Sequence, residues 1–199
     1  MKLYLSNIAD VQFRHREYIT PSRLEQAMRY RMQDDRSRCI AGGVMLREFV
    51  GNTEIFKNEF GKPIARNGVC FNLSHSGDWI LLAVHSTDVG CDIEKLRYTR
   101  YERMGKIVFT DRELAQIHSA FDKMNAFYQI WTKKEALLKC IGSGFHREAK
   151  SVDVSGDSFF EGKDRFYLRT LVFADYILSV CSEDEQPIDL TFVDLSKIY

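Results

Sequence analysis

Hydrophobic and polar residues alternate along several short stretches of the chain, which is the pattern of strands with one buried face. Within Ile80–Val84 the residues are instead nearly all apolar, as expected for a strand covered on both faces. Val89–Glu94 follows closely, and we expect it to extend the same sheet. The predicted strands cover residues 2–8, 69–74, 79–85, 89–94, 152–154, 166–172, 176–181 and 190–193, the last four as antiparallel strands.

Apolar residues at helical spacing lie between these strands. Thr20-Pro21 supplies an N-cap followed by proline at the first helical position. Thr110 and Glu113 fit a capping box. The pair Gly42-Gly43 lies inside a predicted helix, which we expect where a neighbouring element packs closely. The predicted helices cover residues 22–32, 36–49, 101–108, a short segment after 110, and 125–141 with Gly142 as the C-terminal stop.

The order strand, helices, strands occurs twice along the chain. This pattern predicts an α+β fold of two similar halves. We place the N-terminal half at residues 1–96 and the C-terminal half at residues 97–199, with the active site at their interface.

Composition limits the classes of function. Formal net charge is zero, with 28 basic and 28 acidic residues and a pI near 7.0, so no general field draws the protein to nucleic acid or to anionic membranes. Five scattered cysteines without zinc-type spacing indicate buried thiols in a reducing compartment. We find no signal sequence and no apolar run near the ~18 residues of a membrane span, so we expect a cytoplasmic protein.

Two acids end the predicted strand at residues 89–94. Asp92 and Glu94 are two positions apart, so they point to the same side of the strand, and Gly90 before them permits close backbone approach. Carboxylates are suitable ligands for Mg²⁺, which commonly takes one or two of them together with phosphate oxygens. Taken alone, the same pair is typical of two solvated acids at a strand end.

A second polar group lies on the long helix. Trp131, Glu135 and Lys139 are four residues apart and therefore share one stripe. A Glu–Lys pair at this spacing often gives only ~0.2 to 0.5 kcal/mol of surface helix stabilisation. If the stripe faces the other half, however, Glu135 can reach a metal and Lys139 a phosphate.

The hairpin turn supplies a third candidate. Its residues Ser74-His75-Ser76 do not form a GxSxG nucleophile motif, but their hydroxyls, imidazole and backbone amides could bind an anion. A plain turn with a locally bonded histidine is the alternative. Gly61-Lys62-Pro63 is a turn whose lysine is either merely exposed or a clamp on a nucleotide.

These segments together resemble the 4′-phosphopantetheinyl transferases of the surfactin-synthetase-activating (Sfp-type) branch. The resemblance covers roughly residues 20–145. It is carried, in order, by Gly61-Lys62-Pro63, Phe71-Asn72-Leu73-Ser74-His75-Ser76, Gly90-Cys91-Asp92-Ile93-Glu94, Phe109-Thr110 with Glu113, and Trp131 with Lys134-Glu135-Ala136 and Lys139. It implies a pseudo-dimer of two α+β halves in one chain. It also implies an enzyme that transfers the phosphopantetheine arm of coenzyme A to a serine of an apo acyl or peptidyl carrier protein, releasing adenosine 3′,5′-bisphosphate.

The resemblance also implies roles for residues of this chain. The expected Mg²⁺ ligands are Asp92, Glu94 and Glu135. The expected coenzyme A contacts are Arg23, Arg38, Lys62, Pro63, Ser74, His75 and Lys139. The expected catalytic residues are Glu135, Lys139 and His75, with Glu135 as metal ligand, general base or both.

Two other functions use the same residues. A coenzyme A or nucleotide-binding module without turnover needs the basic residues but not the acids. A metal-dependent phosphohydrolase uses the acids with water as the nucleophile. For the transferase, we expect a monomer that docks acidic carrier proteins along residues 101–121, where Arg100, Arg103, Lys106 and Arg112 alternate with apolar residues.

Overall fold

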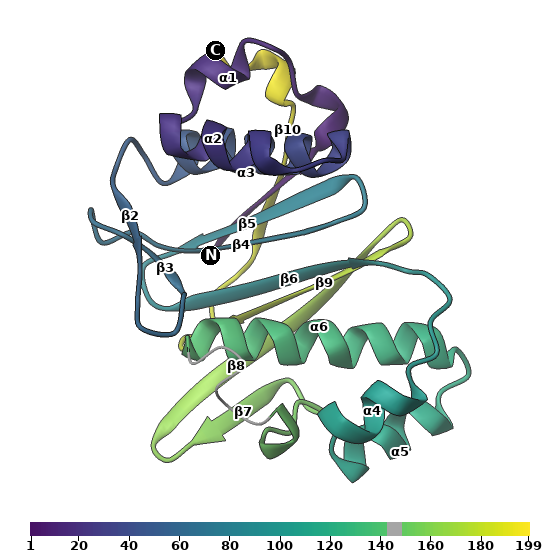
Figure 1. Cartoon of the computed structure of the whole chain (residues 1–199). Helices are drawn as coiled ribbons and strands as arrows, with labels where there is room; N and C mark the ends of the chain where they lie inside the picture. Colours follow the sequence, from purple (N-terminus) through teal and green to yellow (C-terminus); the bar gives the residue numbers. More distant parts are fainter. Residues whose placement is uncertain (143–148) are drawn as a thin grey trace.

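The computed structural model describes residues 1–142 and 149–199. It has four layers in the order helix, sheet, sheet, helix, with α3 covering one sheet and α6 the other (Figure 1). The α+β class predicted from the sequence is confirmed. Among the described residues, no helix is long and apolar enough to cross a membrane.

The first sheet has the strand order β10-β1-β5-β4. Its β4–β5 hairpin is antiparallel, as the sequence predicts, but β4 continues to Ser76, which pairs with Trp79, so Ser74, His75 and Ser76 lie on the strand and not in the turn. Thr20 caps α2 by accepting a hydrogen bond from the Arg23 amide, although this helix ends at Arg29, earlier than predicted. This part of the molecule contains β1 (Lys2–Asn7), β4 (Cys70–Ser76), β5 (Trp79–His85), β10 (Asp189–Val193), α1 (His15–Tyr18), α2 (Pro21–Arg29), α3 (Gln33–Phe49) and the small hairpin β2 (Ile55–Lys57) with β3 (Pro63–Ala65).

The second sheet has the strand order β6-β9-β8-β7. One of its faces packs on the first sheet and the other on α6, which ends at Gly142 with a left-handed φ of 75°. The capping box of Thr110 and Glu113 is present at the start of α5. This part contains β6 (Val89–Lys95), β7 (Ser158–Glu161), β8 (Asp164–Phe173), β9 (Tyr176–Ser182), α4 (Glu102–Val108), α5 (Asp111–Ser119) and α6 (Lys123–Ile141).

The apolar strand β5 is covered on both faces, as predicted. Ile80 and Leu82 pack towards α3, whereas Leu81 and Ala83 pack against the second sheet. The sheets therefore share a core, and burying such side chains from water stabilises their contact at roughly 25 cal/mol per Å² of apolar surface.

Three sequence predictions about strands are wrong. β6 does not extend the β4–β5 hairpin but pairs antiparallel with β9 in the second sheet. β10 is not an antiparallel neighbour of β8 and β9 but pairs parallel with β1. Residues 152–154 form no strand, although Val152 and Val154 are fully buried. For β6 and residues 152–154 the apolar pattern reports burial correctly but does not identify the partner, whereas β10 is largely exposed.

The strand pairing does not follow the division at residue 96. β6 precedes that residue yet joins the second sheet, and β10 follows it yet joins the first. The two halves therefore exchange strands, and one of the two exchanged strands, β6, carries the acidic pair.

Candidate active site

Asp92 lies on β6 at the contact between the two sheets and is only 4% exposed. Its Oδ1 accepts a hydrogen bond from Ser74 Oγ at 2.7 Å and another from Lys139 Nζ at 2.6 Å. Its Oδ2 is buried and has no hydrogen-bond partner within the described part of the chain. Because an unpaired buried carboxylate oxygen is costly, this atom indicates a place for a cation or a donor that the protein does not itself supply.

Gly90 brings β6 into backbone contact with α6. A Cβ at this position would lie 2.0 Å from the Ala136 carbonyl oxygen and 2.4 Å from the Cys140 amide nitrogen. Only glycine permits this approach, which confirms the prediction from the sequence. The contact sets Asp92 beside the stripe of α6 that carries Glu135 and Lys139.

Glu94 and Glu135 share the electrostatic environment of Asp92. Ser76 Oγ donates to Glu94 Oε2 at 2.7 Å. Desolvation raises the pKa of Glu94 and of Glu135. The negative charge of Asp92 raises both pKa values further, and the charge of Glu94 adds to the rise for Glu135. Lys139 opposes these shifts. Asp92 and Glu94 on β6 and Glu135 on α6 are thus close enough for their charges to affect one another.

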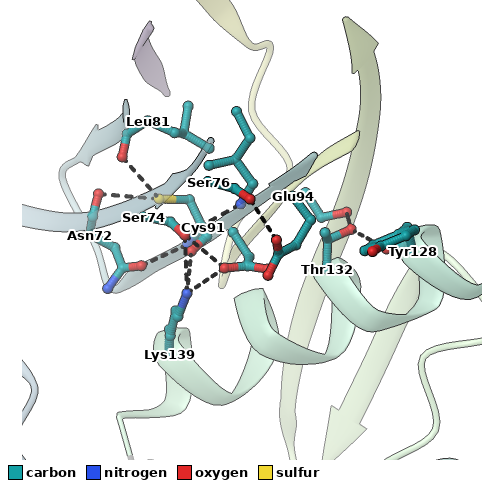
Figure 2. Close-up of polar contacts among 12 residues, drawn as sticks. Asn72, Ser74, Ser76, Leu81, Cys91, Glu94, Tyr128, Thr132 and Lys139 are labelled. Carbon is teal, nitrogen blue, oxygen red and sulfur yellow. Dashed lines mark hydrogen bonds and ion pairs between the residues drawn. The ribbon is translucent and has the colours of Figure 1, made fainter. Parts of the chain in front are cut away.

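Lys139 is the cation of this group. Its Nζ lies 3.4 Å from Ser74 Oγ and 3.3 Å from the Cys91 carbonyl oxygen, in addition to its ion pair with Asp92 (Figure 2). Burial, the largest single effect, lowers its pKa, but the charge and hydrogen bond of Asp92 together with the charges of Cys91 and Glu135 outweigh it, and the net pKa is raised. Lys139 is therefore held protonated at the carboxylates.

Within the described residues, no three histidine, cysteine, aspartate or glutamate side chains are arranged as a metal site. The three-carboxylate Mg²⁺ site of Asp92, Glu94 and Glu135 therefore stays a prediction.

Three basic side chains, His75, Arg38 and Arg23, lie on the face of β4 opposite Ser74. The His75 ring is exposed, yet partial desolvation lowers its pKa, as do the charges of Arg38, Lys139 and Arg23. Arg38 donates to the Gly77 carbonyl at 2.5 Å and pairs with Asp35. The guanidinium groups of Arg38 and Arg23 thus lie within electrostatic range of His75, where an anion could bind.

Arg23 is held by the glycine pair of α3. It donates from Nε to the Cys39 carbonyl at 3.0 Å. A Cβ on Gly42 would lie 2.8 Å from Arg23 Nη2, and one on Gly43 would lie 3.0 Å from Arg23 Cγ. The prediction that Gly42-Gly43 admits a close neighbour is confirmed.

Lys62 is engaged away from this basic group. It forms an ion pair with Asp88 and donates to the Cys140 carbonyl at 2.8 Å, at the C-terminal end of α6. Its side chain is 12% exposed. Pro63 follows it at the start of β3. The predicted role of both residues in coenzyme A binding is not tested by this arrangement.

The role of Lys134 was missed in the sequence. Its Nζ lies 2.8 Å from Glu113 Oε2 in an ion pair that is almost fully buried, and it also donates to the carbonyls of Ala149 and Val152. Glu113 in turn accepts from the Val154 amide. This pair ties α5 and the segment after residue 148 to α6, one residue before Glu135, and no local sequence signal links the two partners.

A cavity of about 270 Å³ lies between α5 and α6, lined by residues that include Gln116, Asn125 and Gln129. None of the predicted site residues lines it. The polar group around Asp92 therefore remains the candidate active site.

Comparison with known proteins identifies the family of this chain. A family model described as the 4′-phosphopantetheinyl transferase superfamily matches residues 88–187, about half of the chain. The 4′-phosphopantetheinyl transferase Sfp of Bacillus subtilis (strain 168) is 27% identical over 93% of this chain and 92% of its own length. The 4′-phosphopantetheinyl transferase HetI of Nostoc sp. is 36% identical over 63% of this chain and 60% of its own length.

Among solved structures, holo-[acyl-carrier-protein] synthase from Neisseria meningitidis matches with a TM-score of 0.41 and 21% identity, over 49% of this chain and 98% of that one. The matched family segment begins at β6 and includes both Asp92 and the whole of α6. The chain belongs to the 4′-phosphopantetheinyl transferase superfamily of enzymes, and its similarity to Sfp over nearly its full length assigns it to the Sfp-type branch.

Proposed function

We propose that this protein transfers the 4′-phosphopantetheine arm of coenzyme A to a serine of an apo acyl or peptidyl carrier protein and releases adenosine 3′,5′-bisphosphate. Family membership and the names of the relatives support this activity. The observation that carries the proposal is the placement of Lys139 on Asp92, with Glu135 in electrostatic range, where β6 packs on α6.

One observation supports a magnesium ion at this site, although the three carboxylates are not arranged around a common point in this structure. Asp92 Oδ2 is a buried oxygen without a partner in the described residues, and two further carboxylates lie near it. Asp92, Glu94 and Glu135 would hold the ion, in keeping with the preference of Mg²⁺ for oxygen ligands. When bound, the ion supplies positive charge that offsets the charge of the coenzyme A pyrophosphate.

Side chains of this protein would stabilise the leaving group and remove the proton from the attacking serine. The carrier serine oxygen forms a bond to the pantetheine-side phosphorus, and the bond from that phosphorus to the bridging oxygen breaks. Lys139 stabilises the negative charge that builds on the departing bisphosphate. Glu135 takes the serine proton, directly or through a water, since its raised pKa makes it a better proton acceptor than an ordinary glutamate.

The nucleotide end of coenzyme A is assigned to the basic group around the hairpin turn. Arg23, Arg38 and His75 would bind the 3′-phosphate, with Ser74 nearby. Lys62 and Pro63 would contact the adenosine, which requires Lys62 to exchange its partner Asp88 for the substrate. His75 also belongs to the proposed catalytic group because it lies close enough to Lys139 for that lysine's charge to affect its pKa.

Carrier docking is assigned to α4 and the start of α5. Arg100, Arg103, Lys106 and Arg112 are all exposed there. Ile107 and Phe121 are exposed apolar residues of the same region. An acidic carrier protein suits this surface, and Arg103→Glu should raise its KM while leaving the KM for coenzyme A unchanged. An unchanged KM for the carrier would count against this docking surface. Because its formal net charge is zero, we propose that the protein binds neither nucleic acid nor anionic membranes. We further propose that it is a cytoplasmic monomer.

Intact-mass spectrometry of a panel of apo carrier proteins tests the proposed activity. Incubation with coenzyme A and Mg²⁺ should add one phosphopantetheine group to at least one carrier, and chelation of the metal should prevent it. Release of adenosine bisphosphate from coenzyme A without any acceptor would indicate a phosphohydrolase. Coenzyme A binding without transfer to any carrier would favour a binding module.

A further inference from the structure

The two sheets meet along strand edges that have no backbone partner in their own sheets. β4 is the last strand of the first sheet, and β6 is the first strand of the second. An edge strand presents a row of unpaired N–H and C=O groups, which are costly when buried. β6 is buried over most of its length, so these groups need partners.

Side chains of β4 supply these partners. Asn72 Oδ1 accepts the Cys91 amide at 2.9 Å. Two and four residues later, Ser74 Oγ accepts the Ile93 amide at 3.4 Å and Ser76 Oγ accepts the Lys95 amide at 3.1 Å. Three side chains, spaced by two on β4, thus bind three amides, spaced by two on β6. They fix the register of the two strands.

The two serines also bind the acids of β6. A serine hydroxyl has one hydrogen to donate and two lone pairs to accept. Ser74 donates to Asp92 and Ser76 donates to Glu94, each at 2.7 Å (Figure 2). Each hydroxyl therefore connects a carboxylate to the backbone amide of the next residue. This double contact restricts the carboxylate to one orientation relative to β6.

We propose that Ser76 is a positioning residue that orients the Glu94 carboxylate for cation binding, with Asn72 fixing the register of β6 beside it. The inference rests on the proposed function only in that the cation serves phosphopantetheine transfer. In this role Ser76 acts through its hydrogen bond to Glu94. Removing its hydroxyl leaves Glu94 Oε2 and the Lys95 amide without this partner, so Glu94 can rotate away.

Binding of Mn²⁺ to the full chain, followed by electron paramagnetic resonance without substrate, tests the proposal. Ser76→Ala should raise the Kd for Mn²⁺ about tenfold, as is usual when a residue supporting a metal ligand is lost. Ser76→Thr keeps the hydroxyl and should restore the wild-type Kd. Ser6→Ala is the matched control, because Ser6 is a fully buried strand serine whose hydroxyl has no partner in the described residues, and it should bind Mn²⁺ as wild type does.

A double-mutant cycle separates positioning from a general effect on the fold. In a Glu94→Gln background, Ser76→Ala should cause no further loss of Mn²⁺ binding. An equal loss in both backgrounds overturns the proposal, as does wild-type affinity in Ser76→Ala or a wild-type protein that binds no Mn²⁺. If Ser76→Ala does not fold, Ser76→Cys keeps most of the volume with a weaker donor and should give a smaller loss of the same sign. The carrier transfer assay is measured separately, so a failure of the proposed function is distinguished from a failure of this inference.

Discussion

Lys139 Nζ lies 2.6 Å from Asp92 Oδ1, whereas Asp92 Oδ2 is buried without a hydrogen-bond partner in the part of the chain that the structure describes. One carboxylate thus holds a protein cation on one oxygen and leaves the other open. The lysine offsets the cost of burying Asp92, and the proposed function assigns it to the substrate phosphates.

Lys139→Met should reduce the rate of phosphopantetheine transfer about a hundredfold or more, because it removes a charge that stabilises the departing bisphosphate. The measurement is kcat/KM for coenzyme A with a fixed apo carrier. Lys133→Met is the matched control: Lys133 lies on the same helix but pairs with Asp157 at the surface. A similar loss in both variants would show that α6, and not the Lys139 charge, was disturbed.

Glu135→Gln should abolish transfer and at the same time raise the melting temperature at neutral pH. Desolvation and the neighbouring acids raise the pKa of Glu135 in the folded protein, so its ionised form is less stable there than in the unfolded chain. The excess in melting temperature of the variant over wild type should grow as pH rises above the ordinary glutamate pKa. It should vanish below that pKa, where Glu135 is protonated in both the folded and the unfolded wild-type protein.

Thermal unfolding of wild type and Glu135→Gln between about pH 4 and 8 gives this comparison. The same pKa shift places the acid limb of the transfer pH profile above the usual range of a carboxylate. A variant that is less stable than wild type at neutral pH would contradict the assigned environment of Glu135.

Lys134→Met should lower the free energy of unfolding by about 3 kcal/mol, because it leaves the Glu113 carboxylate buried without its counter-ion. Chemical denaturation followed by circular dichroism measures this loss. The double variant Glu113→Gln with Lys134→Met should recover part of the stability, since no unpaired charge then remains. No destabilisation in the single variant would mean that Glu113 finds another partner.

Much of the fold follows from local sequence signals. Thr20 and Thr110 mark helix starts correctly, Gly142 marks the end of α6, and the apolar strand β5 is buried on both faces. These features depend on residues close together in the chain. The partner of β6, in contrast, is β9, which lies far later in the sequence. Periodicity does not identify such a distant partner.

The candidate site shows the same division. The spacing of Asp92 and Glu94, and of Glu135 and Lys139, indicated which side chains could act together. The pairing of Lys134 with Glu113 and the bonds from Ser76 to Glu94 join elements whose contact the sequence does not predict. The polar residues Asn72, Ser74 and Ser76 do alternate with apolar ones, a pattern that marks a polar face of β4 but not what it meets.

The most direct test of the account is the rate of phosphopantetheine transfer by Asp92→Asn, measured by intact mass of an apo carrier protein that wild type modifies. Circular dichroism first establishes that the variant is folded. The account predicts that transfer is abolished, because a neutral amide in place of this carboxylate can neither form the ion pair with Lys139 nor provide a charged oxygen at the buried position. Near-wild-type turnover by the folded variant would contradict the assignment of this site.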